Sequence, residues 1–163
     1  MVNKIQKKAL VTGSAGFIGF HISKQLLDDG WRVVGLDCMS DYYDVLLKER
    51  RESMLLQYVS YRSVHEKVET PNVLMDLFDE ERPDVVIHLA AQAGVRHSIE
   101  NPRAYLESNM NGTFELLEAA RSYPPDHMLL ASTSSAYGAN KEMPYKEAVK
   151  ADNQLSFYAA TKK

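Results

Sequence analysis

The stretch TGSAGFIG, residues 12–19, decides the fold, because its three glycines follow an apolar segment and open an amphipathic one. Gly13 suits a tight turn with unusual backbone angles, and Gly19 allows a helix to pack closely on a sheet. Gly16 lets the backbone approach a group bound over the helix N-terminus, where unpaired amides and the helix dipole favour negative charge. A strand, this turn and a helix together predict a pyrophosphate-binding turn; the alternative is that the glycines serve turns alone.

An acidic residue stands where such a turn needs one. Asp37 ends the next apolar segment, about 20 residues beyond the glycines, where a carboxylate accepts hydrogen bonds from an adenosine ribose. A 2′-phosphate would be repelled there. The glycines and Asp37 therefore predict a site for NAD in preference to NADP, with a loop-capping aspartate as the alternative.

Short apolar segments alternate with longer amphipathic ones along the chain, the pattern of strand-helix-strand units around a parallel sheet. The expected strands are residues 7–12, 31–37, 58–64, 84–90 and 127–133, and the main expected helices are 17–30, 44–57, 70–81 and 101–122. The sequence predicts an α/β fold, a doubly wound (Rossmann-type) parallel sheet with helices on both faces. We expect one NAD-binding domain over residues 1–163 and no second domain.

Three local features sharpen this prediction. The first helix should stop at Gly30 and bury one stripe of side chains, formed by Ile18, Ile22, Leu26 and Leu27. The helix at 70–81 should have Thr70 as its cap and Pro71 as its first residue. Asn101 and Pro102 should open the longest helix, and residues 138–154 should form a loop of the active site.

The overall composition argues against several classes of protein. Nineteen basic and 22 acidic residues give a net charge of −3, too mild to indicate a nucleic acid or an anionic membrane as partner. Cys38 is the only cysteine, so no intrachain disulfide forms, and the five histidines lack metal-ligand spacing, so we expect no metal site. No apolar run is long enough to span a membrane, and no cleavable leader is evident, so we expect a cytoplasmic protein without membrane contact.

The order Thr-Gly-x-x-Gly-x-x-Gly resembles the extended short-chain dehydrogenases/reductases. Tyr158 and Lys162, in YAATK, match the Tyr-x-x-x-Lys pair of that superfamily, and residues 132–138 (STSSAYG) match its hydroxyl partner. Segments 35–51, 88–113 and 131–140 are similar to the NAD-dependent epimerase/dehydratase family, and within it to UDP-glucuronate 4-epimerases. These enzymes are isomerases of nucleotide sugars in polysaccharide biosynthesis, and the resemblance runs over nearly the whole chain.

The resemblance implies a catalytic group of Thr133, Tyr158 and Lys162. A base must take the hydroxyl proton while hydride leaves the carbon, and a tyrosine hydroxyl, with an ordinary pKa of about 10, needs a nearby positive charge to serve near neutrality. Lys162, one helical turn beyond Tyr158, supplies that charge. Related dehydratases carry an Asp-Glu pair after the threonine; Ser134 and Ser135 stand there in this chain.

The resemblance also implies binding residues and partners. The substrate would be a UDP-sugar, held by Arg96, Ser98, Ser134 and Ser135, and the family forms homodimers through the helix at 101–121. For NAD, the implied residues are Gly13, Ala15, Gly16, Phe17, Ile18, Gly19, Asp37, Leu89, Ala90, Ala91, Gln92, Asn109, Tyr158 and Lys162.

The chain departs from the family pattern in two places. The usual Gly-Asp pair facing adenine is missing from VHEKVET, residues 64–70, where Glu66 or Glu69 would serve instead. Relatives run to roughly twice this length, so we expect a truncated form that lacks the C-terminal substrate domain. A non-catalytic NAD-binding or association module, and another nucleotide-sugar epimerase or dehydratase, are the alternative functions.

Overall fold

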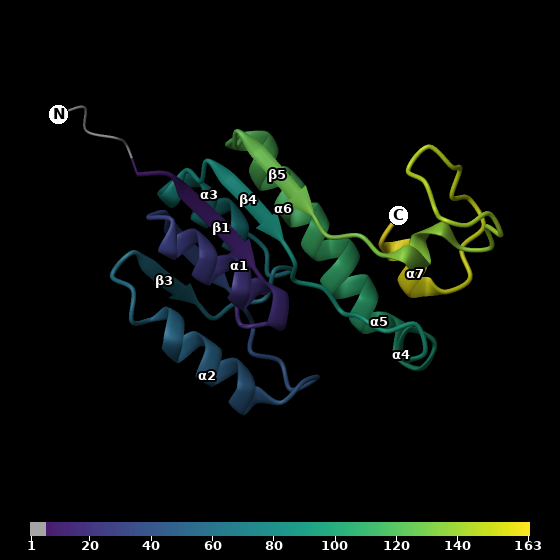
Figure 1. Cartoon of the computed structure of the whole chain (residues 1–163), viewed down its shortest axis with the longest axis horizontal. Helices are drawn as coiled ribbons and strands as arrows, with labels where there is room; N and C mark the ends of the chain where they lie inside the picture. Colours follow the sequence, from purple (N-terminus) through teal and green to yellow (C-terminus); the bar gives the residue numbers. More distant parts are fainter. Residues whose placement is uncertain (1–5) are drawn as a thin grey trace.

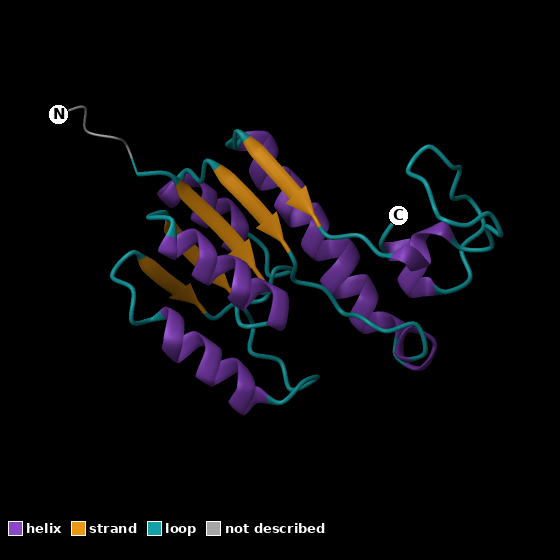
Figure 2. Ribbon diagram, in the orientation of Figure 1, coloured by secondary structure: helices purple, strands orange, loops and turns teal. Residues whose placement is uncertain are grey.

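The computed structural model describes residues 6–163 and shows a single parallel sheet flanked by helices (Figures 1 and 2). The sheet has the strand order β3-β2-β1-β4-β5. All four neighbouring pairs are parallel. The strands are β1 (Lys8–Thr12), β2 (Arg32–Leu36), β3 (Tyr61–Val64), β4 (Val85–His88) and β5 (His127–Leu130). The predicted fold class is confirmed.

The register brings the carboxyl ends of the strands level at one edge of the sheet. Thr12, the last residue of β1, pairs with Leu36 on one side and with His88 on the other. Because the chain winds outward from β1 in one direction and from β4 in the other, the sheet has its topological switch between these two strands. Ligands of open α/β sheets bind in the crevice at such a point.

Helices cover both faces of this sheet. On one face lie α1 (Phe17–Asp28) and α2 (Val45–Leu55), and on the other α3 (Val73–Glu81) and α6 (Gly112–Ser122). The remaining helical segments are α4 (His97–Glu100), α5 (Pro102–Tyr105), a π-helical turn η1 (Leu106–Asn111), a 3-10 turn η2 (Ser134–Tyr137) and α7 (Phe157–Thr161). The segments α5, η1 and α6 follow one another without a break and form one long rod beside β5 (Figure 1). Within residues 6–163, no helix is long and apolar enough to cross a membrane.

Alternate residues of β1 fill two separate cores. Leu10 faces the core under α3 and α6, together with Phe78 and Leu116. Ala9 and Val11 point the other way, into the core under α1 and α2. Successive side chains of a strand point to opposite faces, so an uninterrupted apolar strand indicates a sheet that is buried on both sides.

The first helix confirms its predicted end but not its whole buried stripe. It ends at Asp28, and Gly30 follows with φ +83°, the left-handed conformation expected of a helix stop. Ile18, however, is 60% exposed, while Phe20 is buried. Ile18 lies in the first helical turn, beyond the end of the sheet, so the core cannot cover it.

Two other expected boundaries were wrong. The helix predicted at 70–81 begins only at Val73, because Asn72 adopts a left-handed φ of 69° and Thr70 accepts a turn hydrogen bond from Val73. A left-handed residue ends right-handed winding, so Thr70 and Pro71 lie outside the helix. The strand predicted at 58–64 begins at Tyr61, because the amide of Tyr58 bonds back to Leu55 at the end of α2.

The glycine turn predicts a measurable difference between two alanine substitutions. A Cβ at Gly19 would lie 2.1 Å from the Gly13 carbonyl oxygen, whereas a Cβ at Gly30 would meet nothing within 4 Å. We expect Gly19→Ala to lower the free energy of unfolding by about 3 kcal/mol through backbone displacement. Gly30→Ala, which bears only the strain of positive φ, should cost about 1 kcal/mol. Urea denaturation of both variants measures this, and equal losses would contradict the close approach of α1 to the turn.

Candidate functional site

A cleft of about 670 Å³ opens at the carboxyl edge of the sheet. The glycine turn, Asp37, the loop after β4 and α7 all contribute to its walls. Of the residues expected at the site, those lining it are Gly13, Gly16, Phe17, Ile18, Gly19, Asp37, Leu89, Ala90, Ala91, Gln92, Tyr158 and Lys162. Residues far apart in the sequence therefore meet at one crevice.

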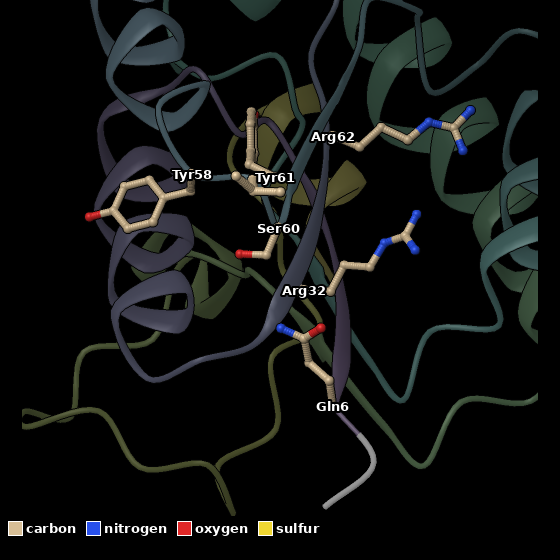
Figure 3. Close-up of a pocket in the computed structure, with 7 residues that line it drawn as sticks. Gln6, Arg32, Tyr58, Ser60, Tyr61 and Arg62 are labelled. Carbon is tan, nitrogen blue, oxygen red and sulfur yellow. The ribbon is translucent and has the colours of Figure 1, made fainter. Parts of the chain in front are cut away.

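A second hollow lies at the opposite edge of the sheet, where β2 and β3 begin (Figure 3). Its two arginines, Arg32 and Arg62, are both ion-paired with Glu81, whose side chain is only 6% exposed. Lys8 joins the same carboxylate at 3.7 Å. These pairs join β1, β2 and β3 to α3, so the charges here serve the packing of the sheet.

The glycine turn is shaped by its neighbours. Gly13 has φ +72°, its amide donates to the Leu36 carbonyl at 2.7 Å, and a Cβ on it would lie 2.9 Å from the Ala90 amide nitrogen. Gly16 then sits at the N-cap of α1. The first amides of a helix have no partner within it, and those of α1 open into the cleft beside Phe17 and Ile18, which suits an anionic group.

Asp37 is held firmly at the end of β2. One carboxylate oxygen accepts the Ala15 amide at 3.1 Å; the other accepts the Met39 amide at 2.9 Å and the Lys48 ammonium at 3.4 Å. A carboxylate offers about four acceptor positions, so one remains for a ribose hydroxyl. Ala15 itself is buried and does not line the cleft; it acts through its bond to Asp37.

Lys48 was missed by the sequence reasoning. Its side chain is 8% exposed, and its ammonium also contacts the Ser40 hydroxyl at 3.3 Å. It stands in the charged run KERRE of α2, where a lysine ordinarily faces solvent. Only the fold of the segment between Asp37 and α2 turns this one inward, so no signal in the sequence could have found it.

A buried hydroxyl ties the end of β1 to the loop after β4. The Thr12 hydroxyl oxygen accepts the amides of Leu89 and Ala90 at 3.2 and 3.1 Å. Its proton is then left for Nδ1 of His88, 2.8 Å away, which places the ring proton of His88 on Nε2. Burial, and secondly the charge of Lys162, lower the pKa of His88 to about 4. His88 is therefore neutral at physiological pH.

Asn109 joins the loop after β4 to α7. It lies in η1 and is 2% exposed. Its Oδ1 accepts the Gln92 amide at 2.8 Å, and its Nδ2 lies 3.0 Å from the Gln92 carbonyl and 2.9 Å from the Thr161 hydroxyl. Asn109 thus bonds to the cleft wall and does not itself line the cleft; its contact with the cofactor stays a prediction. The π-helical turn fits this position, since such turns are frequent at functional sites.

The short helix α7 brings Tyr158 and Lys162 to the cleft. Ser156 caps it by accepting the Ala159 amide at 3.0 Å, and Ala159 is buried. Lys162, just past the last helical residue, donates to the Ala131 carbonyl at 3.1 Å, and burial lowers the pKa of its ammonium. Both side chains line the cleft opposite the glycine turn, the arrangement that proton transfer to a bound group requires.

The expected hydroxyl and substrate residues are placed differently. Thr133 caps η2 by accepting the Ser135 amide at 3.2 Å, and Ser132, rather than Thr133, lines the cleft. Arg96 and Ser134 are exposed, and Ser135 is half-buried. Ser98 is 1% exposed and donates to the Val95 carbonyl at 2.6 Å, and its role as a substrate contact stays a prediction.

The cleft fits a dinucleotide. Its glycine turn leaves space that side chains would fill, and Asp37 keeps an acceptor position for a ribose. The side-chain nitrogen Nε2 of Gln92 is buried at the cleft wall without a hydrogen-bond partner among the described residues. A buried unpaired donor indicates a missing acceptor, such as a carboxamide oxygen. Glu66 and Glu69 also line the cleft, as the adenine prediction requires.

Comparisons with known proteins agree with this geometry. The NAD dependent epimerase/dehydratase family matches residues 9–163. The chain is 51% identical over 154 residues to a probable UDP-glucuronate 4-epimerase of Rhizobium meliloti, covering 94% of this chain and 45% of that protein. It is 44% identical over 154 residues to a UDP-glucuronate 4-epimerase of Thermodesulfobacterium geofontis, covering 94% and 47%.

A crystal structure shows the same likeness. The UDP-glucuronic acid 4-epimerase of Bacillus cereus, in complex with UDP-glucuronic acid and NAD, superposes with a TM-score of 0.86 at 35% identity. The match covers 95% of this chain and 48% of that one. The chain therefore spans about half the length of the relatives it matches.

The buried His88 predicts a pH-dependent stability. An unfolded histidine takes up a proton near pH 6.5, whereas folded His88 resists it until about pH 4. Its contribution to stability is therefore full above pH 6.5 and is lost as the pH falls toward 4, by about 3 kcal/mol. Denaturant unfolding at pH 7, 5.5 and 4 should show this excess loss relative to His88→Asn, which keeps an acceptor for Thr12. Parallel pH profiles of the two proteins would contradict a neutral buried His88.

Removing the Asn109 side chain should loosen α7. We expect Asn109→Ala to speed hydrogen exchange at the amides of Gln92 and Lys162 by about tenfold, since hydrogen bonds that position both segments are lost. Thr161→Val removes the bond from Asn109 and the bond that the Thr161 hydroxyl donates to the Tyr158 carbonyl, and it should affect Lys162 but not Gln92. Unchanged exchange at Gln92 in Asn109→Ala would show that Asn109 does not hold the loop.

Proposed function

Because the chain belongs to the NAD-dependent epimerase/dehydratase family, we propose that it is the NAD-binding domain, residues 1–163, of a UDP-glucuronate 4-epimerase. The carrying observation is that Tyr158 and Lys162 open onto the same cleft as the glycine turn and Asp37. The similarity to named UDP-glucuronate 4-epimerases supports the choice of sugar.

Each part of the cleft has a role in holding the cofactor. The first amides of α1 bind the pyrophosphate, Asp37 binds the adenosine ribose with Lys48 balancing its charge, and Gln92 donates to the nicotinamide end. When bound, NAD supplies an acceptor for the hydrogen at C4 of the sugar and returns it to the opposite face. The net reaction is an inversion at C4 without net oxidation.

The proton moves through Tyr158. As the phenolate, its oxygen would take the proton of the C4 hydroxyl while the 4-keto sugar forms, and the resulting tyrosine hydroxyl would return that proton when the keto group is reduced. The ammonium of Lys162 places a positive charge at the same cleft, and Thr133, which caps η2 next to the cleft-lining Ser132, would orient the reacting hydroxyl. The half-buried setting of Lys162 and Tyr158 strengthens this electrostatic effect, because the dielectric constant there is lower than in water.

The substrate's carboxylate would meet hydroxyls and an arginine. Ser134 and Ser135 follow the catalytic threonine and are suited to bond a uronate carboxylate, with Arg96 on the facing loop as its counter-charge. Neither serine can act as the acid or base that elimination of water requires, so epimerisation is favoured over dehydration. The product would be UDP-galacturonate, a precursor in polysaccharide biosynthesis in the cytoplasm.

A second copy would cover the long helix of the expected dimer. Four exposed apolar side chains form one stripe on it: Leu106, Met110, Phe114 and Leu117. Their spacing of three and four residues places them on one helical face, and an apolar stripe of this kind indicates an interface. We include a homodimer through residues 101–121 in the proposal.

Calorimetric titration with NAD and NADP tests the cofactor site. We expect NAD to bind at least about tenfold more tightly than NADP, because the Asp37 carboxylate repels a 2′-phosphate. Asp37→Asn should weaken NAD binding and narrow this preference, while Asp126→Asn, an exposed acid before β5, should change neither. A folded chain that binds neither dinucleotide would overturn the proposal.

An activity assay tests the identity of the sugar substrate. Joined to the C-terminal half of a relative, the chain should interconvert UDP-glucuronate and UDP-galacturonate, and Tyr158→Phe should slow this at least about a hundredfold. NAD binding without interconversion would refute the substrate assignment. Epimerisation by the 163 residues alone, abolished by Tyr158→Phe, would exclude a purely binding role.

A further inference from the structure

The segment after Asp37 crosses the cleft and is fastened on its far side. We call residues 38–44 the strap; Cys38, Ser40, Tyr42, Tyr43 and Asp44 all line the cleft. From its contacts we propose that Tyr42 is a latch residue, whose hydroxyl must release the Ala93 carbonyl before a dinucleotide enters or leaves. This inference rests on the proposed function, because it concerns exchange of the same cofactor.

The latch is a hydrogen bond between loops 51 residues apart in the sequence. The Tyr42 hydroxyl donates to the Ala93 carbonyl at 2.9 Å. The hydroxyl of Tyr105, whose side chain is fully buried, lies 2.7 Å from the same oxygen and 2.6 Å from the Gly94 carbonyl. The receiving loop is thus held by the core, so the strap is the partner free to move.

A series of aromatic rings connects the latch with the reactive tyrosine. The ring of Tyr42 packs on Tyr43 and on His97, with centroids 4.7 and 5.1 Å apart. Tyr105 lies 6.0 Å from His97 on one side and 5.9 Å from Tyr158 on the other. The latch therefore closes the cleft on the side of the reactive tyrosine, between it and the Asp37 end.

The backbone takes left-handed conformations in both segments that the latch joins, the strap and the loop that carries Ala93. Met39, the second residue of the strap, has φ 52°, a conformation that a methionine keeps only where surrounding contacts hold it. Its amide bonds to Asp37, and Ser40 contacts Lys48. On the far side Gly94 has φ +105°, and a Cβ there would lie 3.0 Å from the Tyr42 hydroxyl oxygen. A glycine leaves room for the latch.

The latch is a single hydrogen bond between two uncharged groups, so it can open and close at a small cost in free energy. Tyr42 is 38% exposed, so water can replace its bond when the strap lifts, and opening costs little. Because the latch is a bond between two parts of the protein, weakening it should speed both entry and release of a dinucleotide and leave the equilibrium affinity nearly unchanged. A residue that bound the cofactor directly would instead change the affinity.

Stopped-flow fluorescence with NADH, and displacement by excess NAD, measures both rates. We expect Tyr42→Phe to raise the association and release rates together by about fivefold, the change for one lost neutral hydrogen bond, with Kd unchanged within about twofold. Tyr123→Phe is the matched control and should match the parent chain, since the Tyr123 ring packs on the Arg82 guanidinium and does not line the cleft. An unchanged release rate, or a weaker Kd with unchanged association, would overturn the latch.

Hydrogen exchange of the chain without a dinucleotide tests the latch separately from the function. Amides of residues 38–44 should exchange about fivefold faster in Tyr42→Phe, while those of the sheet stay unchanged. Equal exchange of the strap in both proteins would refute the latch even if NAD binds. Failure of the parent chain to bind NAD, with faster strap exchange in the variant, would refute the proposed function and leave the latch standing.

Discussion

The structure depends on one buried hydroxyl, that of Thr12, at the point where the sheet changes its direction of winding. It accepts two amides from the loop after β4 and faces Nδ1 of His88. These three contacts place the end of β1 against the end of β4, and only a glycine at position 13 fits against the Ala90 backbone. A cleft forms at the switch point because both strands stop there.

A second joint links this junction to the proposed reaction centre. Asn109 holds both backbone groups of Gln92 and the hydroxyl of Thr161, so the cofactor wall and α7 share one buried side chain. An isolated helix of five residues is unstable in water. Here Ser156, Asn109 and the buried Ala159 supply the tertiary contacts that position Tyr158, and the strap between Asp37 and α2 closes the same space from the other side.

Much of the site was predictable because its chemistry is local. A glycine turn between strand and helix and an acid at the next strand end identify themselves by spacing, and apolar alternation identifies the sheet. Other features depended on the exact course of a turn or on where the sheet ends. Ile18 has helical periodicity but lies beyond the end of the sheet, Asn72 takes a left-handed turn that releases Thr70 from the helix, and Ser98 turns its hydroxyl onto Val95. Lys48 shows the same limit, since its burial arises from the strap and not from its neighbours in the sequence.

The sequence by itself determined the α/β fold class, the glycine turn for the cofactor and the residue types that carry the proposed chemistry. These features follow from short-range periodicity and spacing. Only the tertiary structure decided that Asn109 bonds to both Gln92 and Thr161, that Thr133 caps a turn beside the cleft, and that Tyr42 reaches Ala93. Each of these depends on a hydrogen bond between segments distant in the chain or on the exact course of a loop. Such contacts are fixed by the packing of the whole domain, and no local pattern encodes them.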